Sequence, residues 1–418
     1  MTAGNPAAFE NIEKKKEKTM ETIKTLEELP LSEKRVLIRV DYNVPMNEKG
    51  EITDDTRISK SLDTLRYCLE RKAKVILMSH LGRPKGAPDA KYSLKPAALH
   101  LSKLLGKPVT MLPDCVGAEV EKAVQAMQPG DVVMLENLRF HAEETKNDAS
   151  FSKKLASLAD FYVNDAFGAA HRAHASTVGV TEYLPSAAGF LLALELRYLG
   201  KAITNPDRPF VTILGGAKVS DKIKLISNLI DKADTILIGG AMAYTFYKVM
   251  GIAIGNSKFE PEGVPAAEEA LKKAQAKNFP LLFPDDRVVA TSIETAAQSK
   301  VIDTEIPDGW SGFDIGPKTV EKYKKVLAGA KTIVWNGPVG LFEIKPFDKG
   351  TYELAKFIGG LTATKIIGGG DTAAAVRQFG FDSQMSHVST GGGASLEFLE
   401  GTQLPGVVAL AHKTTVSK

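Results

Sequence analysis

Short apolar runs alternate with longer amphipathic stretches along most of this chain, and this rhythm is the strongest constraint on its fold. The longer stretches, such as residues 59–73, carry apolar residues at helical spacing. Strands that alternate with helices in this way form parallel α/β sheets, which bind ligands at the carboxyl ends of their strands. The runs that we predict to be buried strands are 35–40, 74–80, 131–137, 160–167, 210–216, 234–240, 331–337, 364–370 and 386–393.

A chain of 418 residues is long enough for two domains, and its residue types divide it into two halves. Nine of the twelve arginines and five of the seven histidines precede residue 201, whereas 25 of the 36 glycines follow it. Arginines at strand ends bind small anions through a fixed fork of donors, and glycines let a phosphate approach backbone N–H groups. We therefore predict an acid or phosphate-ester site in the first half and a nucleotide site in the second. A helix and a Pro-bounded loop within residues 184–209 would connect them.

The bulk composition argues against several other classes of protein. The net charge of +3 is too small to predict a nucleic-acid or membrane partner, and no apolar run reaches the length of a spanning helix. Two cysteines, Cys68 and Cys115, exclude a disulfide framework and a Cys-rich zinc site, and they fit a reducing compartment. The first 24 residues are highly charged, without the apolar core of a secretory signal, and their glutamates argue against a transit peptide. We therefore expect a cytoplasmic protein.

Two motifs near the start of the first half place polar residues after predicted strands. The motif "VDYNVP" offers Asp41 and Asn43, which either bind the hydroxyl and carboxylate of a substrate or form a simple Asx turn before Pro45. The motif "SHLGRP" offers His80 and Arg83 on a turn after a buried strand, and is harder to explain by local structure alone.

Further basic residues follow the next two predicted strands. "LENLRFH" contains Arg139, and "NDAFGAAHRAHAST" contains His171, Arg172 and His174. Arg57, in "DDTRIS", lies on a predicted helix and is either functional or a surface charge. Because the carboxyl ends of parallel strands meet at one edge, we predict a converging basic pocket. Metal binding by the two histidines is the weaker alternative, since no acidic or Cys partner lies at ligand spacing.

In the second half, "ILGGAKVSDK" ends a predicted strand in two glycines and then supplies Lys218 and Lys222. A spacing of four residues is one helical turn, so we expect both lysines to point the same way and to compensate charge on a phosphoryl group. The chain contains no Walker A motif. "NGPVGLFE" is an aliphatic turn that could flank a purine, with Glu343 accepting from ribose hydroxyls.

The stretch "KIIGGGDTAAAV" (365–376) permits a tight turn, a dinucleotide-binding loop or a phosphate cradle. Gly368, Gly370 and Ala373 match the dinucleotide pattern, but the next predicted strand does not end in the acid that this pattern requires. Asp371 at the start of a helix would repel a bare pyrophosphate, whereas it suits Mg²⁺ between carboxylate and phosphate. A simple N-terminal helix acid remains an alternative for Asp371.

Eight motifs together resemble the phosphoglycerate kinase family. In order they are "RVDYNVP", "SHLGRP", "LENLRFH", "NDAFGAAHRAHAST", "ILGGAKVSDK", "WNGPVGLFE", "IIGGGDT" and "SHVSTGGGASLEFLEG". The resemblance covers residues 22–412 and implies an α/β fold of two Rossmann-like parallel-sheet domains joined by a helix and hinge, with the C-terminal tail packing back on the first domain. The implied divisions are a charged extension (1–21), a 3-phosphoglycerate-binding domain (22–186 with 404–418 returning), a connecting helix and hinge (187–204) and a nucleotide-binding domain (205–403).

The resemblance also implies a role for each matching residue. The residues that would hold 3-phosphoglycerate are Asp41, Asn43, Arg57, His80, Arg83, Arg139 and Arg172. Those that would hold the nucleotide are Gly216, Lys218, Lys222, Gly240, Gly312, Asn336, Pro338, Glu343, Gly369, Gly370, Asp371 and Thr372, with Asp371 as the Mg²⁺ ligand. Arg57, Lys218 and Lys222 would be catalytic, and Arg57 and Lys222 would stabilise the phosphoryl group in flight.

The implied reaction is reversible, Mg²⁺-dependent phosphoryl transfer between ATP and the carboxylate of 3-phosphoglycerate, giving ADP and 1,3-bisphosphoglycerate. A carboxylate with a pKa of about 4 is already ionised at pH 7, so direct in-line transfer needs no general base. The difficulty is the attack of an anion on an anion, which fixed positive charge relieves. Because the two sites lie in different domains, hinge closure would align the substrates and expel water. We expect a monomer with no nucleic-acid or membrane partner.

Two other classes of function stay open at this point. A NAD-dependent dehydrogenase, which the missing acid disfavours, would be detected by a hydride-transfer assay. A binding or scaffold protein would keep the fold but would not need Arg57, Lys222 and Asp371, all of which are present.

Overall fold

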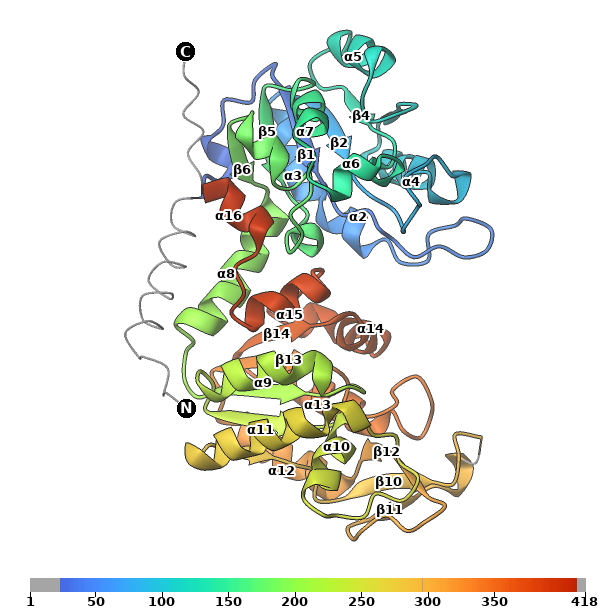
Figure 1. Ribbon diagram of the computed structural model, residues 1–418, viewed down its shortest axis with the longest axis vertical. Coiled ribbons are helices and arrows are strands. Elements are labelled where there is room, and N and C mark those ends of the chain that lie inside the picture. The colour runs from blue at the N-terminus through green and yellow to red at the C-terminus, as the bar shows by residue number, and fades with distance from the viewer. Residues whose placement is uncertain (1–22, 295, 412–418) are drawn as a thin grey trace. The chain divides into compact units, whose positions relative to one another are not determined.

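A computed structural model of the protein describes residues 23–294 and 296–411 (Figure 1). Among these, residues 23–197 and 403–411 form one compact unit, unit 1, and residues 198–402 form a second, unit 2. The division falls within helix α8 (Phe190–Thr204). The predicted extension at 1–21 and the last part of the predicted tail, 412–418, lie outside the described residues.

Unit 1 is built on a six-stranded sheet in the order β3-β4-β2-β1-β5-β6, in which every neighbouring pair is parallel. Its central strands β1 and β2 are mostly apolar and each is buried at four of five positions, as expected where helices cover both faces. The strands are β1 (Arg35–Arg39), β2 (Lys74–Met78), β3 (Thr110–Met111), β4 (Val132–Met134), β5 (Phe161–Asn164) and β6 (Ser186–Ala188). The helices are α2 (Thr56–Lys60), α3 (Leu62–Glu70), α4 (Lys95–Leu105), α5 (Ala118–Gln125), α6 (Ala142–Thr145), α7 (Ala149–Ala156) and α16 (Pro405–Ala411).

Helix α16 follows unit 2 in the sequence and packs on unit 1 beside β6 (Figure 1). The N–H of Gly406 donates to Ala170 O at 2.8 Å, and Asn164 Nδ2 donates to Gly406 O at 3.4 Å. A side chain at Gly406 would approach the backbone of Ala170 to about 3.0 Å, so glycine permits this close contact.

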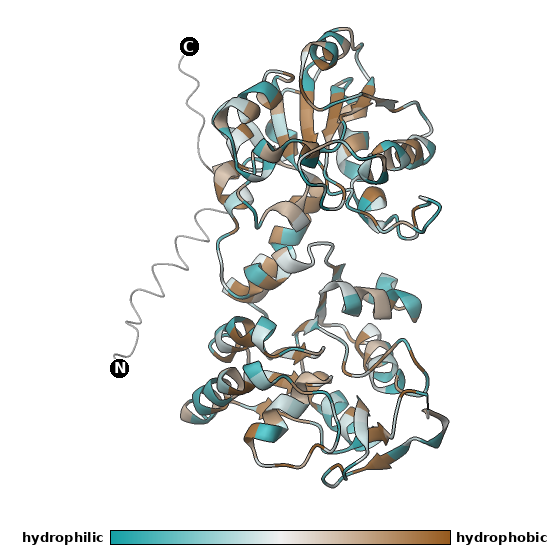
Figure 2. Cartoon of the chain, turned by 45° about the vertical axis from the view of Figure 1, so that its right-hand side comes forward, coloured by the Kyte–Doolittle hydropathy of each residue, from teal (hydrophilic) through white to brown (hydrophobic). Residues whose placement is uncertain are grey.

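Unit 2 repeats the plan with a second parallel six-stranded sheet in the order β15-β14-β13-β7-β8-β9. Apolar residues gather on the strands of both sheets (Figure 2). The strands are β7 (Phe210–Leu214), β8 (Thr235–Ile238), β9 (Leu281–Leu282), β13 (Thr332–Asn336), β14 (Thr364–Gly368) and β15 (His387–Val388). The helices are α9 (Ile223–Ile230), α10 (Met242–Val249), α11 (Val264–Ala276), α12 (Pro317–Leu327), α13 (Lys349–Gly359), α14 (Gly370–Gln378) and α15 (Gly393–Leu399).

The prediction of two parallel-sheet domains is confirmed, and each of the nine predicted strands contains an observed one. The structure differs in four details. The short strands β3, β6 and β9 were not predicted. The single helix expected at 59–73 is two helices that meet at Ser61, whose hydroxyl donates to Ile58 O. The strand expected at 386–393 ends at Val388, because the glycines after it begin α15. A small antiparallel sheet of β10 (Arg287–Ala290), β11 (Lys300–Ile302) and β12 (Ser311–Ile315) was not predicted.

Among the described helices, none combines the length and the apolar character that crossing a membrane would require.

Candidate active site

A fully buried arginine, Arg39, ends β1 and organises the loops around it. Its Nε donates to Ser176 Oγ at 2.8 Å, and its Nη2 lies 3.1 Å from His80 Nδ1. Because a guanidinium only donates, Nδ1 accepts and the His80 proton lies on Nε2. Burial, followed by the charges of Arg39 and Arg139, holds the pKa of His80 well below its usual value. His80 is therefore a neutral hydrogen-bond donor at pH 7 and adds no positive charge to the predicted basic pocket.

Helix α2 presents Arg57 to the polar residues that follow β1. Arg57 Nη1 donates to Asp41 Oδ1 at 3.2 Å and to Asn43 O at 2.8 Å. Asp41 Oδ1 also accepts the Asn43 N–H at 3.2 Å, so the Asx turn is present as well. The two interpretations of "VDYNVP" are compatible, because the turn holds the Asp41 carboxylate against Arg57.

Three of the predicted arginines, Arg83, Arg139 and Arg172, line a cavity of about 490 Å³. Its other lining residues include no acid: they are Pro84, Lys85, Gly86, His141, Ala142, Thr145 and His174. Burial, then the charges of Arg172 and Arg39, lowers the pKa of Arg139 to about 10. The buried Nε of Arg139 has no hydrogen-bond partner in the described part of the chain. Like charges held together with a donor left over are the arrangement that an anion would stabilise.

The remaining predicted substrate residues do not line this cavity: they are Asp41, Asn43, Arg57 and His80. Gly82 links the two groups, because its N–H donates to Asn43 Oδ1 at 2.8 Å and its carbonyl accepts from Arg139 Nη1 at 2.7 Å. Gly82 has a φ of +61°, and a side chain there would meet the ring of Tyr92 at 2.4 Å. Glycine is therefore required at the joint between them.

A second layer of buried groups supports these residues and was not predicted. Glu144 is fully buried and accepts from the N–H of Ser176 at 3.0 Å and from its hydroxyl at 2.6 Å. Burial raises the pKa of Glu144, but contacts with His174, Arg39 and Ser176 outweigh burial and lower it overall. Glu144 is thus the counter-charge of Arg39. The only sequence signal was an arginine inside the apolar run "RVLIRV".

In unit 2, glycine-rich loops after four strands surround a cavity of about 410 Å³. Eight of the twelve predicted nucleotide residues line it: Gly216, Lys218, Lys222, Asn336, Gly369, Gly370, Asp371 and Thr372. The other lining residues are Ala217, Asp221, Gly337, Gly392, Gly393 and Leu396. The long helix α14 begins at this cavity, so its first N–H groups and dipole favour an anion there.

Asp371 and Thr372 have different environments within the first turn of α14. Asp371 is exposed, whereas Thr372 is fully buried and its Oγ1 accepts the N–H of Gly337 at 2.6 Å. Gly369 precedes the helix with a φ of +83°, a conformation that other residues rarely adopt. Thr372 therefore joins the loops after β13 and β14, and Asp371 offers a free carboxylate beside them. An exposed carboxylate next to a phosphate cradle fits Mg²⁺, which prefers such oxygen ligands.

The two lysines reach this cavity, but not from one helical turn as we expected. Lys218 is exposed on a loop, and Lys222 ends the short 3₁₀ turn Ser220–Lys222. Lys222 Nζ donates to Gly215 O at 2.6 Å. Burial lowers the pKa of Lys222 to about 8, although the nearby charges of Asp371 and Asp221 act in the opposite direction.

The other four predicted nucleotide residues do not line the cavity. The carbonyl of Pro338 accepts the N–H of Gly216 at 2.9 Å and so joins the loops after β13 and β7, and the N–H of Gly240, after β8, donates to Val339 O at 2.9 Å. Gly312 lies on β12, where a side chain would overlap the hydroxyl of Tyr244. Glu343 is exposed in the loop after β13.

Two lining residues that were not predicted, Gly392 and Gly393, belong to a pattern that was visible in the sequence. Gly392 and Gly393 follow β15 and start α15, just as Gly369 and Gly370 follow β14 and start α14. The repeated strand–glycine–helix pattern in "SHVSTGGGASLEFLEG" was the signal.

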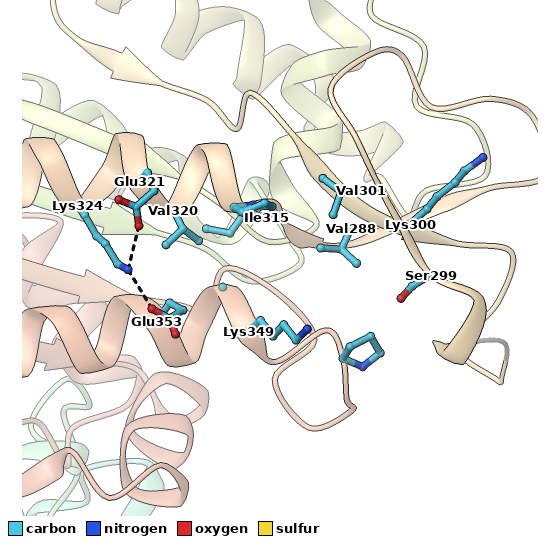
Figure 3. Close-up of a pocket in the computed structure, with 13 residues that line it drawn as sticks. Val288, Ser299, Lys300, Val301, Ile315, Val320, Glu321, Lys324, Lys349 and Glu353 are labelled. Atoms are coloured by element: carbon cyan, nitrogen blue, oxygen red, sulfur yellow. Dashed lines mark hydrogen bonds and ion pairs between the residues drawn. The ribbon is translucent and has the colours of Figure 1, made fainter.

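A third cavity of about 440 Å³ lies elsewhere in unit 2 and contains no predicted site residue. Val288, Ile315 and Val320 form its apolar wall (Figure 3). Lys324 Nζ lies 3.1 Å from Glu321 Oε1 and 2.9 Å from Glu353 Oε2, so its charge is already paired (Figure 3).

Comparison with known proteins gives a consistent result. The model of the family described as phosphoglycerate kinase matches residues 26–402. The chain is 55% identical over 394 residues to phosphoglycerate kinase of Fervidobacterium nodosum, covering 93% of this chain and 98% of the relative. It is also 55% identical to phosphoglycerate kinase of Synechococcus elongatus, with the same coverage of both chains. The solved structure of phosphoglycerate kinase from Coxiella burnetii superposes with a TM-score of 0.83 at 43% identity, covering 93% of this chain and 98% of that one.

Two α/β units, one with an arginine-lined cavity and one with a glycine-lined cavity, together with these relatives, define an enzyme of the kinase class that transfers phosphoryl groups. The chain belongs to the phosphoglycerate kinase family, and so to the transferases of glycolysis. This family assignment decides against the dehydrogenase and scaffold alternatives.

Proposed function

We propose that the two units divide the phosphoglycerate kinase reaction between them, with 3-phosphoglycerate bound by unit 1 (predicted domain 22–186 with 404–418) and the nucleotide by unit 2 (predicted domain 205–403). The reaction converts ATP and 3-phosphoglycerate to ADP and 1,3-bisphosphoglycerate and is reversible. The observation that carries the proposal is the cavity of unit 1, which has three arginines and no acid. Such a cavity suits a substrate that bears both a phosphate and a carboxylate.

In unit 1, Arg83, Arg139 and Arg172 would bind the phosphate of 3-phosphoglycerate. The Asp41 carboxylate would accept from the hydroxyl of the substrate, and the Asn43 amide nitrogen would donate to its hydroxyl or carboxylate oxygens. His80 would donate from Nε2, which is consistent with the acceptance of the Arg39 hydrogen bond by Nδ1. Neutral His80 can approach the substrate without adding a proton equilibrium to the step.

Arg57 would stabilise the phosphoryl group during transfer. Its present partners are the Asp41 carboxylate and one carbonyl, and its side chain is 30% exposed, so it is accessible to a second anion. A guanidinium beside three equatorial oxygens stabilises the charge that spreads over them in the transition state.

In unit 2, Lys218, Lys222 and the backbone of Gly369–Thr372 would hold the phosphates, with Asn336 and Gly216 beside them. Asp371 would hold Mg²⁺, which would neutralise part of the charge on the phosphates. Gly240, Gly312 and Pro338 would shape the adenosine region, and Glu343 would accept from the ribose hydroxyls.

No group acts as a general base in this proposal. The nucleophile is a carboxylate, already ionised near neutral pH, and the low pKa of His80 makes that imidazole a weak base. The rate would come from fixed positive charge and from alignment, which is worth roughly 7–11 kcal/mol in well-oriented reactions. Since each substrate is assigned to its own unit, transfer requires closure about the connecting helix and hinge predicted at 187–204.

A coupled assay tests the proposal. The purified chain is supplied with Mg²⁺ and ATP, and 1,3-bisphosphoglycerate formation is followed through NADH oxidation by an added dehydrogenase. We expect turnover only when 3-phosphoglycerate is present, and much slower turnover with glycerate, which lacks the phosphate that the arginines would bind. ATP consumption that does not depend on 3-phosphoglycerate would refute it. The expectations of a monomer and of a cytoplasmic location stay predictions; the elution volume on a calibrated gel-filtration column tests the first.

A further inference from the structure

Three side chains of metal-ligand type meet at the edge of the unit 1 sheet: Asp114, Cys115 and His141. Asp114 and Cys115 lie in the loop after β3, and His141 lies between the 3₁₀ turn Leu138–Phe140 and α6, after β4. Because β3 and β4 are parallel neighbours, their following loops leave the sheet at the same edge. Topology thus brings His141 together with two residues that lie 26 and 27 positions earlier in the sequence.

The ligand atoms of the three side chains all lie within 4.8 Å of one another. His141 Nε2 is 2.7 Å from Asp114 Oδ1, and the side chains of His141 and Asp114 are 27% and 46% exposed. Cys115 is buried beneath them. Of the residues that the structure describes, these form the one group of three or more His, Cys, Asp or Glu side chains with this geometry.

We propose that Asp114, Cys115 and His141 form a Zn²⁺ site. One thiolate, one imidazole and one carboxylate are a mixed donor set that suits Zn²⁺ and not Mg²⁺, which prefers oxygen ligands alone. Three protein ligands leave one position of a tetrahedron open, and His141 also lines the arginine cavity, from which a water molecule can fill that position. The site differs from the predicted Mg²⁺ ligand Asp371, and it does not depend on the roles proposed for the substrate residues.

Small movements are enough to bind the metal. Ligand nitrogen and oxygen atoms in a tetrahedral Zn²⁺ site with bonds of about 2.1 Å are separated by roughly 3.4 Å. The hydrogen bond between His141 and Asp114 would therefore open by about 0.7 Å, with the metal replacing the proton between them. The partial exposure of both side chains allows this movement, while the ring of His141 stays stacked on Phe151.

Binding at this site is linked to pH through Cys115. Burial, followed by the negative charges of Asp114 and Glu144, raises the pKa of the Cys115 thiol well above its usual value. The thiol is therefore protonated in the free protein and must release its proton when a metal binds. The apparent metal affinity is therefore expected to rise with pH.

Co²⁺ is the probe for the test, because it replaces Zn²⁺ in tetrahedral sites and gives a thiolate charge-transfer band when sulfur is a ligand. The untagged full chain, freed of metals with EDTA, is titrated with Co²⁺ in the presence of excess Mg²⁺. We expect a charge-transfer band that saturates at one Co²⁺ per chain and disappears when Zn²⁺ is added. The absence of the band in the wild-type chain would overturn the proposal.

The chain provides a matched control, since its other cysteine, Cys68, is also buried but lies outside the cluster. The Cys68→Ser variant should keep the band and Cys115→Ser should lose it; the reverse pattern would overturn the proposal. Circular dichroism checks that each variant is folded. If Cys115→Ser does not fold, Asp114→Asn and His141→Gln decide the matter: each should weaken Co²⁺ binding at least tenfold, and unchanged affinity in both would refute the site.

Discussion

Lys222 offers the sharpest test of the electrostatics of the nucleotide cradle. Its ammonium group donates to Gly215 O at 2.6 Å, and burial lowers its pKa to about 8. A phosphate beside Nζ would favour the charged form and move the pKa back toward the usual value for lysine. Nucleotide binding above pH 8 is therefore accompanied by the uptake of a proton from solution onto Lys222. The perturbation that removes this linkage is Lys222→Arg, because arginine stays protonated throughout this range.

The size of the effect follows from the depressed pKa. At pH 8.5, a group with a pKa of about 8 is about three-quarters neutral, so binding should take up about 0.75 proton per nucleotide. The sign is fixed: the free protein loses the charge as pH rises through 8, and the complex keeps it. Nucleotide affinity should thus fall about tenfold between pH 7 and 9, provided that the neutral amine contributes little.

Isothermal titration calorimetry measures this uptake directly. Mg-ADP is titrated into the chain at pH 8.5 in two buffers of different ionisation enthalpy, such as Tris and Bicine, and the difference in heat gives the number of protons. Lys222→Arg should abolish most of the proton uptake. Lys218→Arg is the matched control, because the exposed Lys218 lines the same cavity. This variant retains Lys222 and should therefore preserve the uptake. Uptake below about 0.2 proton in the wild-type chain, or equal uptake in Lys222→Arg, would refute the reasoning.

Three further substitutions test other contacts of the two sites. Arg57→Ala should lower kcat by roughly 10²–10³-fold while changing the ADP dissociation constant less than about threefold, since it removes a donor used mainly in the transition state. Steady-state kinetics measures the first quantity and calorimetry the second. Unchanged turnover would exclude the role of Arg57 in stabilising the phosphoryl group. Asp371→Ala should weaken Mg-ADP binding about tenfold or more and leave 3-phosphoglycerate binding unaltered, and a titration showing the reverse would contradict the metal assignment. Thr372→Val should cost about 1–3 kcal/mol in urea unfolding, because the buried N–H of Gly337 loses its acceptor, whereas Thr372→Ser should keep most of the stability.

Much of the fold was predictable because parallel strands leave strong local signals. The central strands β1, β7 and β13 have five residues each, are mostly apolar, and are buried throughout apart from the first residue of β1. The unpredicted strands are weaker: β3 and β9 have two residues each, and β11 is mostly exposed. Short edge strands are defined by pairing with a neighbour rather than by their own composition, so a single sequence carries little information about them.

In the candidate site, too, features formed by adjacent residues could be predicted from the sequence, whereas contacts between distant residues could not. The loop "GGGDT" was recognised as a candidate binding loop because glycine, acid and helix start are adjacent in sequence, and its residues line the cavity of unit 2. The contact between Thr372 and Gly337 joins loops that are 35 residues apart, and the contact between Glu144 and Ser176 joins loops that are 32 apart. Ligand spacing likewise failed for His174, whose acidic neighbour Glu144 lies 3.6 Å away but 30 positions earlier in the chain. Such pairs appear only once the strand order is known.

The buried charges of unit 1 are of two kinds: some hold the candidate site together, and others are available to bind a ligand. Arg39 is fully enclosed and has Glu144 as its counter-charge through Ser176, so that pair is complete without a ligand. Arg139 is subject to the charges of Arg172 and Arg39, has no acid among its cavity neighbours and keeps a buried Nε without a partner in the described residues. Holding these charges together is unfavourable in the free protein. An anion that enters the cavity relieves this repulsion, so part of its binding free energy comes from strain that the fold maintains through the Arg39–Glu144 pair.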